Sequence, residues 1–292
     1  MPQTLHRHEK GQPAGLRAPV GDKGTGATSH IRIGHGSDGI ERLEARFVGP
    51  AFSLHRHDTY AIGVTLSGVQ TFHYRGERRL CLPGQGHILH PDETHDGGPA
   101  TAEGFGYRIV YVDPALIQQA LGGRPLPFVA DPVIDANVFE HALPPALWRL
   151  EDPIDDVAQV DLTAAMADML VTAAARTSPA KGGSLRLASL LSIRDLITAL
   201  PAAPLSLEAL ETVSGLDRWS LARQFRAAFG TSPSSFRTMR QLDQVRRLIR
   251  DGQPLATAAL AAGFADQSHM SRMFKRAYGL TPARWAAAVA NR

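Results

Sequence analysis

Residues 263–282, GFADQSHMSRMFKRAYGLTP, contain the signals of a turn followed by an amphipathic helix. Gly263 permits a turn, Asp266 can cap the N-terminus of a helix, and Gly279 is typical of the position where a helix ends. Between them an apolar stripe lies opposite a polar, basic face; the stripe is Met270, Phe274, Ala277 and Tyr278, and the polar face is Ser268, Ser271, Arg272 and Lys275. Taken alone, this pattern fits a solvated surface helix best.

A second, related stretch lies at residues 217–236, DRWSLARQFRAAFGTSPSSF, and an offset of 49 aligns it with residues 266–285. The residues that define the turn and the helix recur in the same order. The matched pairs are Asp217 and Asp266, Arg223 and Arg272, Phe225 and Phe274, Gly230 and Gly279, Pro233 and Pro282, and Phe236 and Trp285. This repeat predicts two helix-turn-helix units within one domain.

The segment from about residue 185 to residue 290 resembles the DNA-binding domain of the AraC/XylS family of bacterial transcription regulators, and the string at 263–282 is the most specific part of that resemblance. In that family each unit offers its second helix to the major groove, and the two units bind successive turns on one face of the duplex. The resemblance implies an all-α DNA-binding domain over residues 184–292, in which a long helix from about 235 to 251 joins the units.

The polar faces of the two second helices contain the candidate DNA-contacting residues. These are Trp219, Ala222, Arg223 and Arg226 in the first unit, and Gln267, Ser268, Ser271, Arg272 and Lys275 in the second. Arg223 and Arg272 are the leading candidates for base readout, because a guanidinium can donate two hydrogen bonds to guanine. The remaining basic residues are expected to contact phosphate or solvent, namely Arg226, Lys275, Arg276, Arg240 and Arg246.

Charge is divided unevenly along the 292 residues. Residues 184–292 contain 15 Lys and Arg against 7 Asp and Glu, whereas residues 1–183 contain 16 against 21. A basic C-terminal part favours nucleic-acid binding there, because phosphate neutralisation drives it. We expect a cytoplasmic protein without membrane association, since the sequence shows neither an apolar signal-peptide core nor a run of about 18 uncharged apolar residues, and its single cysteine allows no intrachain disulfide.

The N-terminal half changes from a polar tail to a series of strand-like runs. Residues 1–38 are rich in Gly, Pro, Lys and His and are expected to be disordered. Between residues 40 and 113, β-branched and aromatic runs alternate with Gly and Pro turn signals, which predicts strands at 42–48, 60–66, 70–74, 79–82, 86–90 and 105–112. This spacing predicts a small antiparallel barrel or jelly roll, and the whole chain is therefore expected to be a two-domain α+β protein.

Two stretches, HRHDTYAIGVTLSG at residues 55–68 and PGQGHILHPDETHDG at residues 83–97, resemble the cupin-like sensor domain of the same family. The resemblance implies a ligand-binding domain over residues 39–176, with helices at its C-terminal end and a pocket suited to one small molecule. The candidate effector contacts are His55, His57, Tyr60 and His95.

The same histidines raise the alternative of a metal site. His55 and His57 have the spacing of the first cupin motif, and His95 occupies the histidine position of the second. Metal-binding cupins usually place a glutamate about four residues after the second histidine, where this chain has residues 60–62, Tyr-Ala-Ile. We therefore expect no bound metal and no cofactor; the alternative is a metal-dependent cupin enzyme fused to a DNA-binding module.

The remaining segments connect the two domains. A helix is predicted from about 155 to 176, whose broad apolar face can pack on the sensor domain or form a homodimer interface. Residues 177–183 are the best linker.

The whole pattern favours a ligand-responsive transcription regulator over an enzyme. By resemblance, it is expected to be an activator that works with double-stranded DNA, a small-molecule effector, RNA polymerase and a second copy of itself. A DNA-binding protein with a vestigial pocket is the other alternative.

Overall fold

Alternating buried and partly exposed residues build the N-terminal domain from short strands in a computed structural model that describes residues 29–49, 51–175 and 185–290. In the eight residues of Ile40–Phe47, for example, the apolar side chains point inward. The strands are β1 (His30–Ile33), β2 (Ile40–Phe47), β3 (Phe52–His55), β4 (Tyr60–Gly68), β5 (Gln70–Tyr74), β6 (Glu77–Cys81), β7 (Gly86–Leu89), β8 (His95–Pro99), β9 (Phe105–Val112) and β10 (Val133–Ile134).

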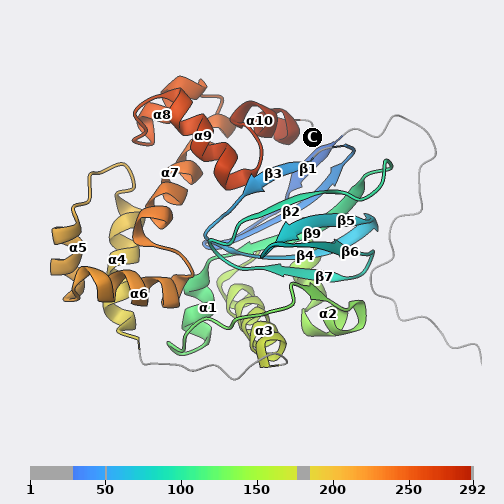
Figure 1. The fold of residues 1–292 in the computed structure, drawn as a ribbon, viewed down its shortest axis with the longest axis horizontal. Helices are drawn as coiled ribbons and strands as arrows, with labels where there is room; N and C mark the ends of the chain where they lie inside the picture. Colours follow the sequence, from blue (N-terminus) through green and yellow to red (C-terminus); the bar gives the residue numbers. More distant parts are fainter. Residues whose placement is uncertain (1–28, 50, 176–184, 291–292) are drawn as a thin grey trace, which may run out of the picture.

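The strands form two antiparallel sheets, ordered β1-β2-β9-β4-β7-β10 and β3-β8-β5-β6. This arrangement confirms the predicted antiparallel jelly-roll type of domain (Figure 1). Each of the six predicted strands is present with small shifts at its ends, whereas β1, β3, β8 and β10 were not predicted. The prediction of a disordered tail up to residue 38 is wrong for β1, because its β-branched residues pair it with β2 in a regular register. Residues 1–28 lie outside the described residues.

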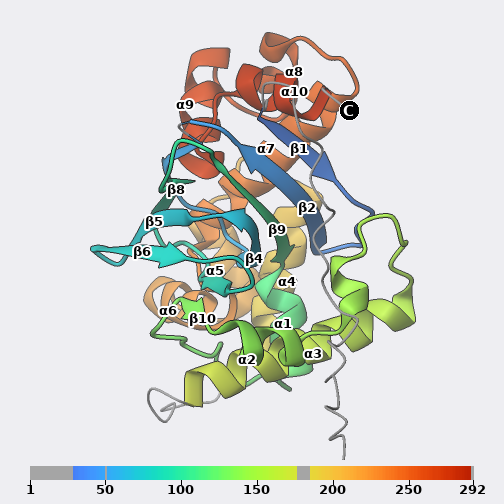
Figure 2. The same cartoon turned by 90° about the vertical axis from the view of Figure 1, so that its right-hand side faces the viewer.

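Three short helical segments and one long helix pack below the larger sheet. The short segments are α1 (Pro114–Ala120), α2 (Ala136–Ala142) and the 3₁₀ turn η1 (Pro145–Trp148), and the long helix is α3 (Asp156–Ala175). Figures 1 and 2 show α1, α2 and α3 on the same side of the molecule. By length and composition alone, α3 could cross a membrane, with a mean hydropathy of 1.3. Leu162, Met166 and Leu170 are nevertheless buried in the sensor core, which accounts for its apolar character. The predicted linker, 177–183, lies outside the described residues.

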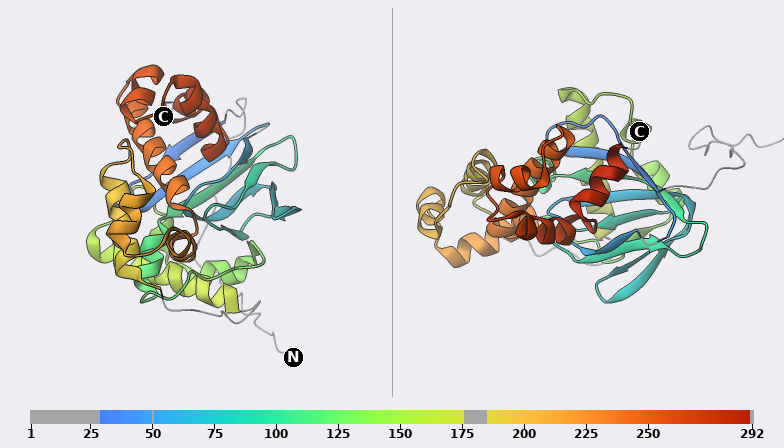
Figure 3. Two further views of the ribbon diagram at one scale, coloured as in Figure 1. Left: turned by 60° about the vertical axis from the view of Figure 1, so that its left-hand side comes forward. Right: turned by 90° about the horizontal axis from the view of Figure 1, so that it is seen from above.

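The C-terminal domain is all-helical and contains the two predicted helix-turn-helix units at opposite ends of α7 (Figure 3). Its helices are α4 (Leu187–Ala199), α5 (Leu207–Ser214), α6 (Arg218–Phe229), α7 (Pro233–Arg250), α8 (Leu255–Ala261), α9 (Gln267–Tyr278) and α10 (Pro282–Ala290). Asp217 and Asp266 cap α6 and α9 through backbone N–H groups, and Gly230 and Gly279 end these helices with φ angles of 72° and 68°. The repeat seen in the sequence is therefore a repeat in structure.

The two domains share one hydrophobic core cluster. Ile31 and Leu43 of the sensor sheet belong to the same cluster as Met239, Phe274 and Trp285 of the helical domain. Figure 2 shows α7, α9 and α10 resting against the end of the sheets where β1 and β2 lie. This packing places part of the DNA-binding domain directly on the sensor.

Candidate functional site: recognition helices and the cavity beneath them

The candidate DNA-contacting residues lie on the outer faces of α6 and α9. Eight of the nine are exposed and Ser271 is half-buried, whereas the apolar stripe that includes Leu221, Phe225, Met270 and Phe274 is buried. Trp219 is 75% exposed, which is unusual for an indole ring and suits a residue that meets a partner. Their placement follows from the caps and the 3.6-residue period, as the sequence predicts.

The C-terminal ends of both helices rest on the sensor domain. At α9, the backbone N–H and the hydroxyl of Ser53 donate to the carbonyl oxygen of Gly279 at 3.1 and 2.9 Å, and the N–H of Arg56 donates to the carbonyl of Arg276 at 2.9 Å. At α6, Arg226 lies 3.8 Å from a carboxylate oxygen of Asp92. Sensor residues therefore hold the orphan carbonyl groups of one recognition helix and a predicted DNA-contacting side chain of the other.

Besides the pair of Arg226 and Asp92, three shorter ion pairs join the helical domain to the sensor. Arg240 lies 2.9 Å from Asp58, Arg246 lies 2.5 Å from Glu41, and Arg194 lies 2.8 Å from Asp113. The expectation that Arg240 and Arg246 contact phosphate or solvent is wrong, because both guanidinium groups are largely covered and face sensor carboxylates. Helical periodicity marks the face of α7 on which they lie, but it does not say what covers that face.

Burial strongly affects the charges in these pairs. It raises the pKa of Asp58 to about 7, although the positive charge of Arg240 acts in the opposite direction. For Arg246, burial alone would lower the pKa, but the carboxylate of Glu41 raises it well above the usual value. Arg246 also stacks over the rings of Tyr278 and Trp285, at 5.0 and 5.2 Å from their centroids. The guanidinium of Arg246 therefore stays charged inside the interface.

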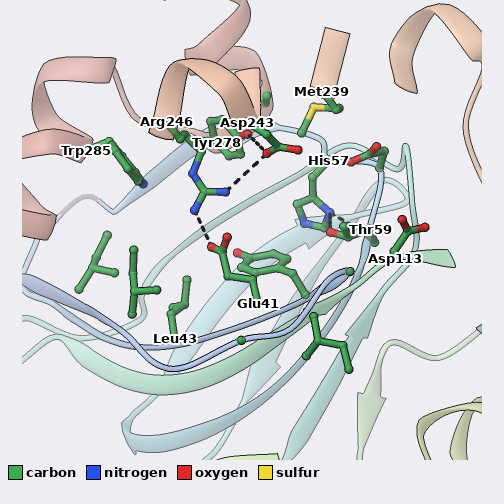
Figure 4. A pocket seen from close by; sticks show the side chains of 18 of the residues that line it. Glu41, Leu43, His57, Thr59, Asp113, Met239, Asp243, Arg246, Tyr278 and Trp285 are labelled. Carbon is green, nitrogen blue, oxygen red and sulfur yellow. Dashed lines mark hydrogen bonds and ion pairs between the residues drawn. The ribbon is translucent and has the colours of Figure 1, made fainter. Parts of the chain in front are cut away.

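A cavity of about 380 Å³ lies between the domains, and its wall comes from both. The sensor contributes Glu41 of β2 and Tyr111 of β9, whereas the helical domain contributes Arg246, Tyr278 and Trp285. Figure 4 shows Arg246 paired directly with Glu41 in the wall of the cavity, and His57 as another part of the lining. Apolar and aromatic walls with a few charged groups are typical of a small-molecule site. None of these five residues was predicted from the sequence to contact a ligand, because the cavity forms only when the two domains meet.

His55, His57 and His95 come together at one end of this cavity. The register of β3 and β8 places His55 opposite His95, and His57 follows two residues after His55. Their ring centroids are 4.3 Å apart for His55 and His95 and 4.8 Å apart for His57 and His95. Burial lowers the pKa of His57 to about 3 and that of His95 to about 4, and it holds the pKa of His55 well below its usual value. All three rings are therefore neutral at physiological pH.

Tyr60 does not join the three histidines, contrary to the predicted set of effector contacts. Its side chain is fully buried in the core shared by the sheet and the sensor helices, and its hydroxyl donates to the carbonyl of Pro127 at 3.1 Å. His55 and His57 line the cavity, and Tyr60 does not. The position of Tyr60 follows from the alternation of side chains along β4, which turns it to the opposite face of the sheet.

The comparisons with known proteins agree with this architecture. The model of the AraC-like ligand binding domain matches residues 39–174, and a helix-turn-helix domain model matches residues 210–288. The chain belongs to the AraC family of transcription regulators. It is an AraC-family regulator with an N-terminal ligand-binding domain and a C-terminal helix-turn-helix DNA-binding domain.

Individual relatives of this AraC-family regulator cover different shares of the chain. An uncharacterised helix-turn-helix regulator of Bacillus subtilis, YbfI, is 24% identical over 79% of this chain and 86% of its own length. The multiple antibiotic resistance protein MarA of Escherichia coli is 29% identical over 31% of this chain and 72% of its own. The crystal structure of ToxT from Vibrio cholerae has the same two-domain fold, with a TM-score of 0.61 and 10% identity over 87% of this chain and all of ToxT.

Proposed function

We propose that this regulator reads a bipartite DNA site with α6 and α9, and that a small molecule in the interdomain cavity controls the reading. The observation that carries the proposal is the shared wall of the cavity, to which both the sensor sheet and the helices α7, α9 and α10 contribute. A ligand shifts an equilibrium only by binding two arrangements with different affinity. A cavity that exists only while the domains are docked meets that requirement, because undocking removes half of the binding site.

The residue roles follow from exposure and chemistry. Arg223 and Arg272 occupy matching positions on the two recognition helices and read bases through bidentate hydrogen bonds to guanine. Gln267 and Ser268 reach bases from the first turn of α9, and Trp219 packs against thymine methyl groups or sugars. Arg226 and Lys275, with the small neighbours Ala222 and Ser271, complete the contact face.

The effector is proposed to be a small molecule that contacts His55 and His57 directly, with His95 behind them. One of the ToxT structures is described as bound to an unsaturated fatty acid, with a TM-score of 0.60 and 12% identity. That finding concerns ToxT, and it supports the idea that a fold of this type can hold a small apolar molecule. The aromatic and apolar wall of the cavity supports the same idea for this chain.

We further propose that the protein acts in the cytoplasm as a homodimeric activator that contacts RNA polymerase. The support for a second copy is α3, on which Val157 and Val160 are 71% and 67% exposed and lie on one face. Sedimentation of the purified protein tests this part: a monomer at all concentrations would contradict it, and Val157→Glu should dissociate a dimer.

The central experiment is selection from a random duplex library by the full-length protein at about physiological salt, where nonspecific electrostatic binding is weak. The expected result is a motif with two halves about one helical turn apart. Recognition by two helices would be contradicted by a single undivided motif. It would also be contradicted if no motif is enriched, either without effector or with cell extract added as a source of effector. If added small molecules never change the affinity in a saturable way, the protein is a DNA-binding protein with a vestigial pocket.

A further inference from the structure

We infer that His55, His57 and His95 form a binding site for one divalent transition-metal ion, and that this ion fixes the part of the sensor on which α9 rests. The three side chains are buried, and one ring nitrogen of each lies within 4.8 Å of the others. Nitrogen ligands at about 2.1 Å from one tetrahedral ion are about 3.4 Å apart, so small ring rotations bring the three nitrogens into coordination distance.

The hydrogen bonds of the rings decide which nitrogens face the ion. The Nδ1 atom of His55 lies 2.8 Å from the carbonyl oxygen of Ser53, that of His57 lies 3.0 Å from the carbonyl of Thr59, and that of His95 lies 2.9 Å from the carbonyl of Glu93. A carbonyl oxygen can only accept, so each Nδ1 carries the proton and each Nε2 offers a lone pair. Hydrogen bonds of this kind orient and strengthen histidine ligands in metal sites.

One of these lone pairs has no partner. Among the described residues, the Nε2 atom of His57 is buried and makes no hydrogen bond. A buried acceptor of this kind costs free energy unless something binds it. A metal ion at the centre of the three histidines satisfies it, and the same ion binds the Nε2 atoms of His55 and His95.

The donor set indicates the class of metal. Three neutral imidazoles suit Zn²⁺, Ni²⁺, Co²⁺, Cu²⁺ or Fe²⁺ and are poor ligands for Mg²⁺ or Ca²⁺, which prefer oxygen. Because this chain lacks the glutamate of the usual cupin motif, the site has no negatively charged ligand, but its three histidine ligands remain. Because His55 and His57 line the interdomain cavity, the remaining coordination position is open to water or to a ligand atom from that cavity.

The three-histidine site lies next to the C-terminal end of the recognition helix α9. His55 ends β3, and its neighbours Ser53 and Arg56 make the backbone hydrogen bonds that hold the C-terminus of α9. The ring of His55 itself abuts Gly279, since a Cβ atom built on Gly279 would lie 3.0 Å from its Nδ1. An ion that ties β3 to β8 through His55 and His95 therefore sets the surface against which α9 rests.

The metal site is tested by binding measurements on the full-length protein after chelator treatment. Titration with Co²⁺, followed by its visible absorption, should show one ion per chain, and Zn²⁺ should displace it. His57→Gln and His95→Gln, checked for folding by circular dichroism, should each weaken Co²⁺ binding by about 100-fold. A matched control replaces the four N-terminal histidines His6, His8, His30 and His35 with alanine and should keep the ion. The proposed site would be overturned if the wild-type protein does not bind one Co²⁺ per chain. It would also be overturned if only the four-histidine control loses Co²⁺ binding.

The coupling rests on the proposed DNA-binding function and is measured separately. With the duplex found by selection, Zn²⁺ should change the affinity of the wild-type protein by about fivefold or more, and it should leave that of His57→Gln unchanged. Equal affinities of the wild type with and without Zn²⁺ would overturn the coupling. If instead the proposed DNA-binding function is wrong, the protein will enrich no DNA motif but will still bind one Co²⁺ per chain.

Discussion

At the scale of single residues, the two arginines at matching positions offer the clearest test of DNA reading. Arg272→Ala should weaken binding to the selected duplex by about 1–3 kcal/mol and leave binding to random duplex nearly unchanged, because a base contact carries sequence information and a phosphate contact does not. Arg223→Ala is the matched variant and should relax specificity only in the other half-site. Equal losses on specific and random duplexes would assign both side chains to the phosphates.

A second residue-scale prediction concerns pH. The N–H of Val129 donates to Nε2 of His90 at 3.1 Å, which requires a neutral ring, and burial lowers the pKa of His90 to about 4. In the unfolded chain the value is about 6.5, so the unfolded state takes up a proton first as the pH falls. The stability due to neutral His90 is therefore present above pH 6.5 and is lost as the pH falls toward 4, by about 2 kcal/mol at pH 5.

Urea unfolding between pH 5 and pH 8, with chelator present, measures this effect. His90→Asn keeps an acceptor for Val129 but cannot titrate, so its stability should fall less steeply below pH 6.5 than that of the wild type. His141→Asn, at an exposed position, is the control and should leave the slope unchanged. If the unfolding free energies of His90→Asn and the wild type fall equally steeply with decreasing pH, His90 is not the cause of the pH dependence.

At the scale of elements, the success of prediction depended on how local the signals are. The helices α6 and α9 could be placed within a residue or two, because caps such as Asp217 and Gly230 lie in the sequence itself. The four-residue strands β1 and β3 could not, because so short a run has no sustained period and owes its position to its partner strand. The three histidines were predicted from a motif, whereas Glu41 and Arg246 became neighbours only through tertiary contact, which no local pattern records.

The contact between α9 and β3 gives the element-scale prediction. Gly279 has a φ angle of +68°, and a Cβ atom there would lie 2.9 Å from the carbonyl oxygen of Ser53 and 2.9 Å from Cβ of Phe52. Gly252, with a φ angle of +78° and open space around it, is a matched control. Gly252→Ala should cost about 1 kcal/mol of stability through the backbone alone. Gly279→Ala should cost on the order of 1–3 kcal/mol more, because α9 must also move away from β3.

Thermal and urea unfolding of the two glycine variants, together with their affinities for the selected duplex, measure this difference. Only Gly279→Ala should also change DNA affinity, since only it displaces a recognition helix. If the two variants lose the same stability and bind DNA equally well, the contact with β3 does not hold α9.

At the scale of the whole molecule, the uneven charge has two uses. The excess of basic residues in the C-terminal part predicts DNA binding. However, Arg194, Arg240 and Arg246 form ion pairs with carboxylates of the acidic sensor domain. Arg223 of α6 and Arg272 of α9 are exposed and remain for the duplex. The same charge asymmetry therefore helps both to dock the two domains and to attract DNA.

Docking of this kind should make the molecule unfold as one unit. The shared hydrophobic cluster and the three ion pairs mean that loss of either domain exposes apolar surface and unpaired charges on the other. Calorimetry at pH 8, where Asp58 is ionised, should show a single transition for the wild type. In the triple variant Glu41→Gln, Asp58→Asn and Asp113→Asn, the three arginines lose their carboxylate partners in the sensor domain. They keep only the partners on their own helices, Asp243 and Asp195. Two transitions should then separate, with the helical domain and the sensor unfolding at different temperatures.

The control for this prediction neutralises three exposed carboxylates that also pair with arginine. Glu77, Glu151 and Asp152 are 67%, 76% and 53% exposed in their side chains, and surface pairs of this kind contribute at most about 1 kcal/mol each. Their amide variants remove the same number of negative charges, so the net charge of the two triple variants is identical. A single transition in the control and two in the interface variant would locate the cooperativity in the interdomain ion pairs. Two transitions already in the wild type would show instead that the domains are independent, and the shared cavity could not then transmit a ligand signal to α6 and α9.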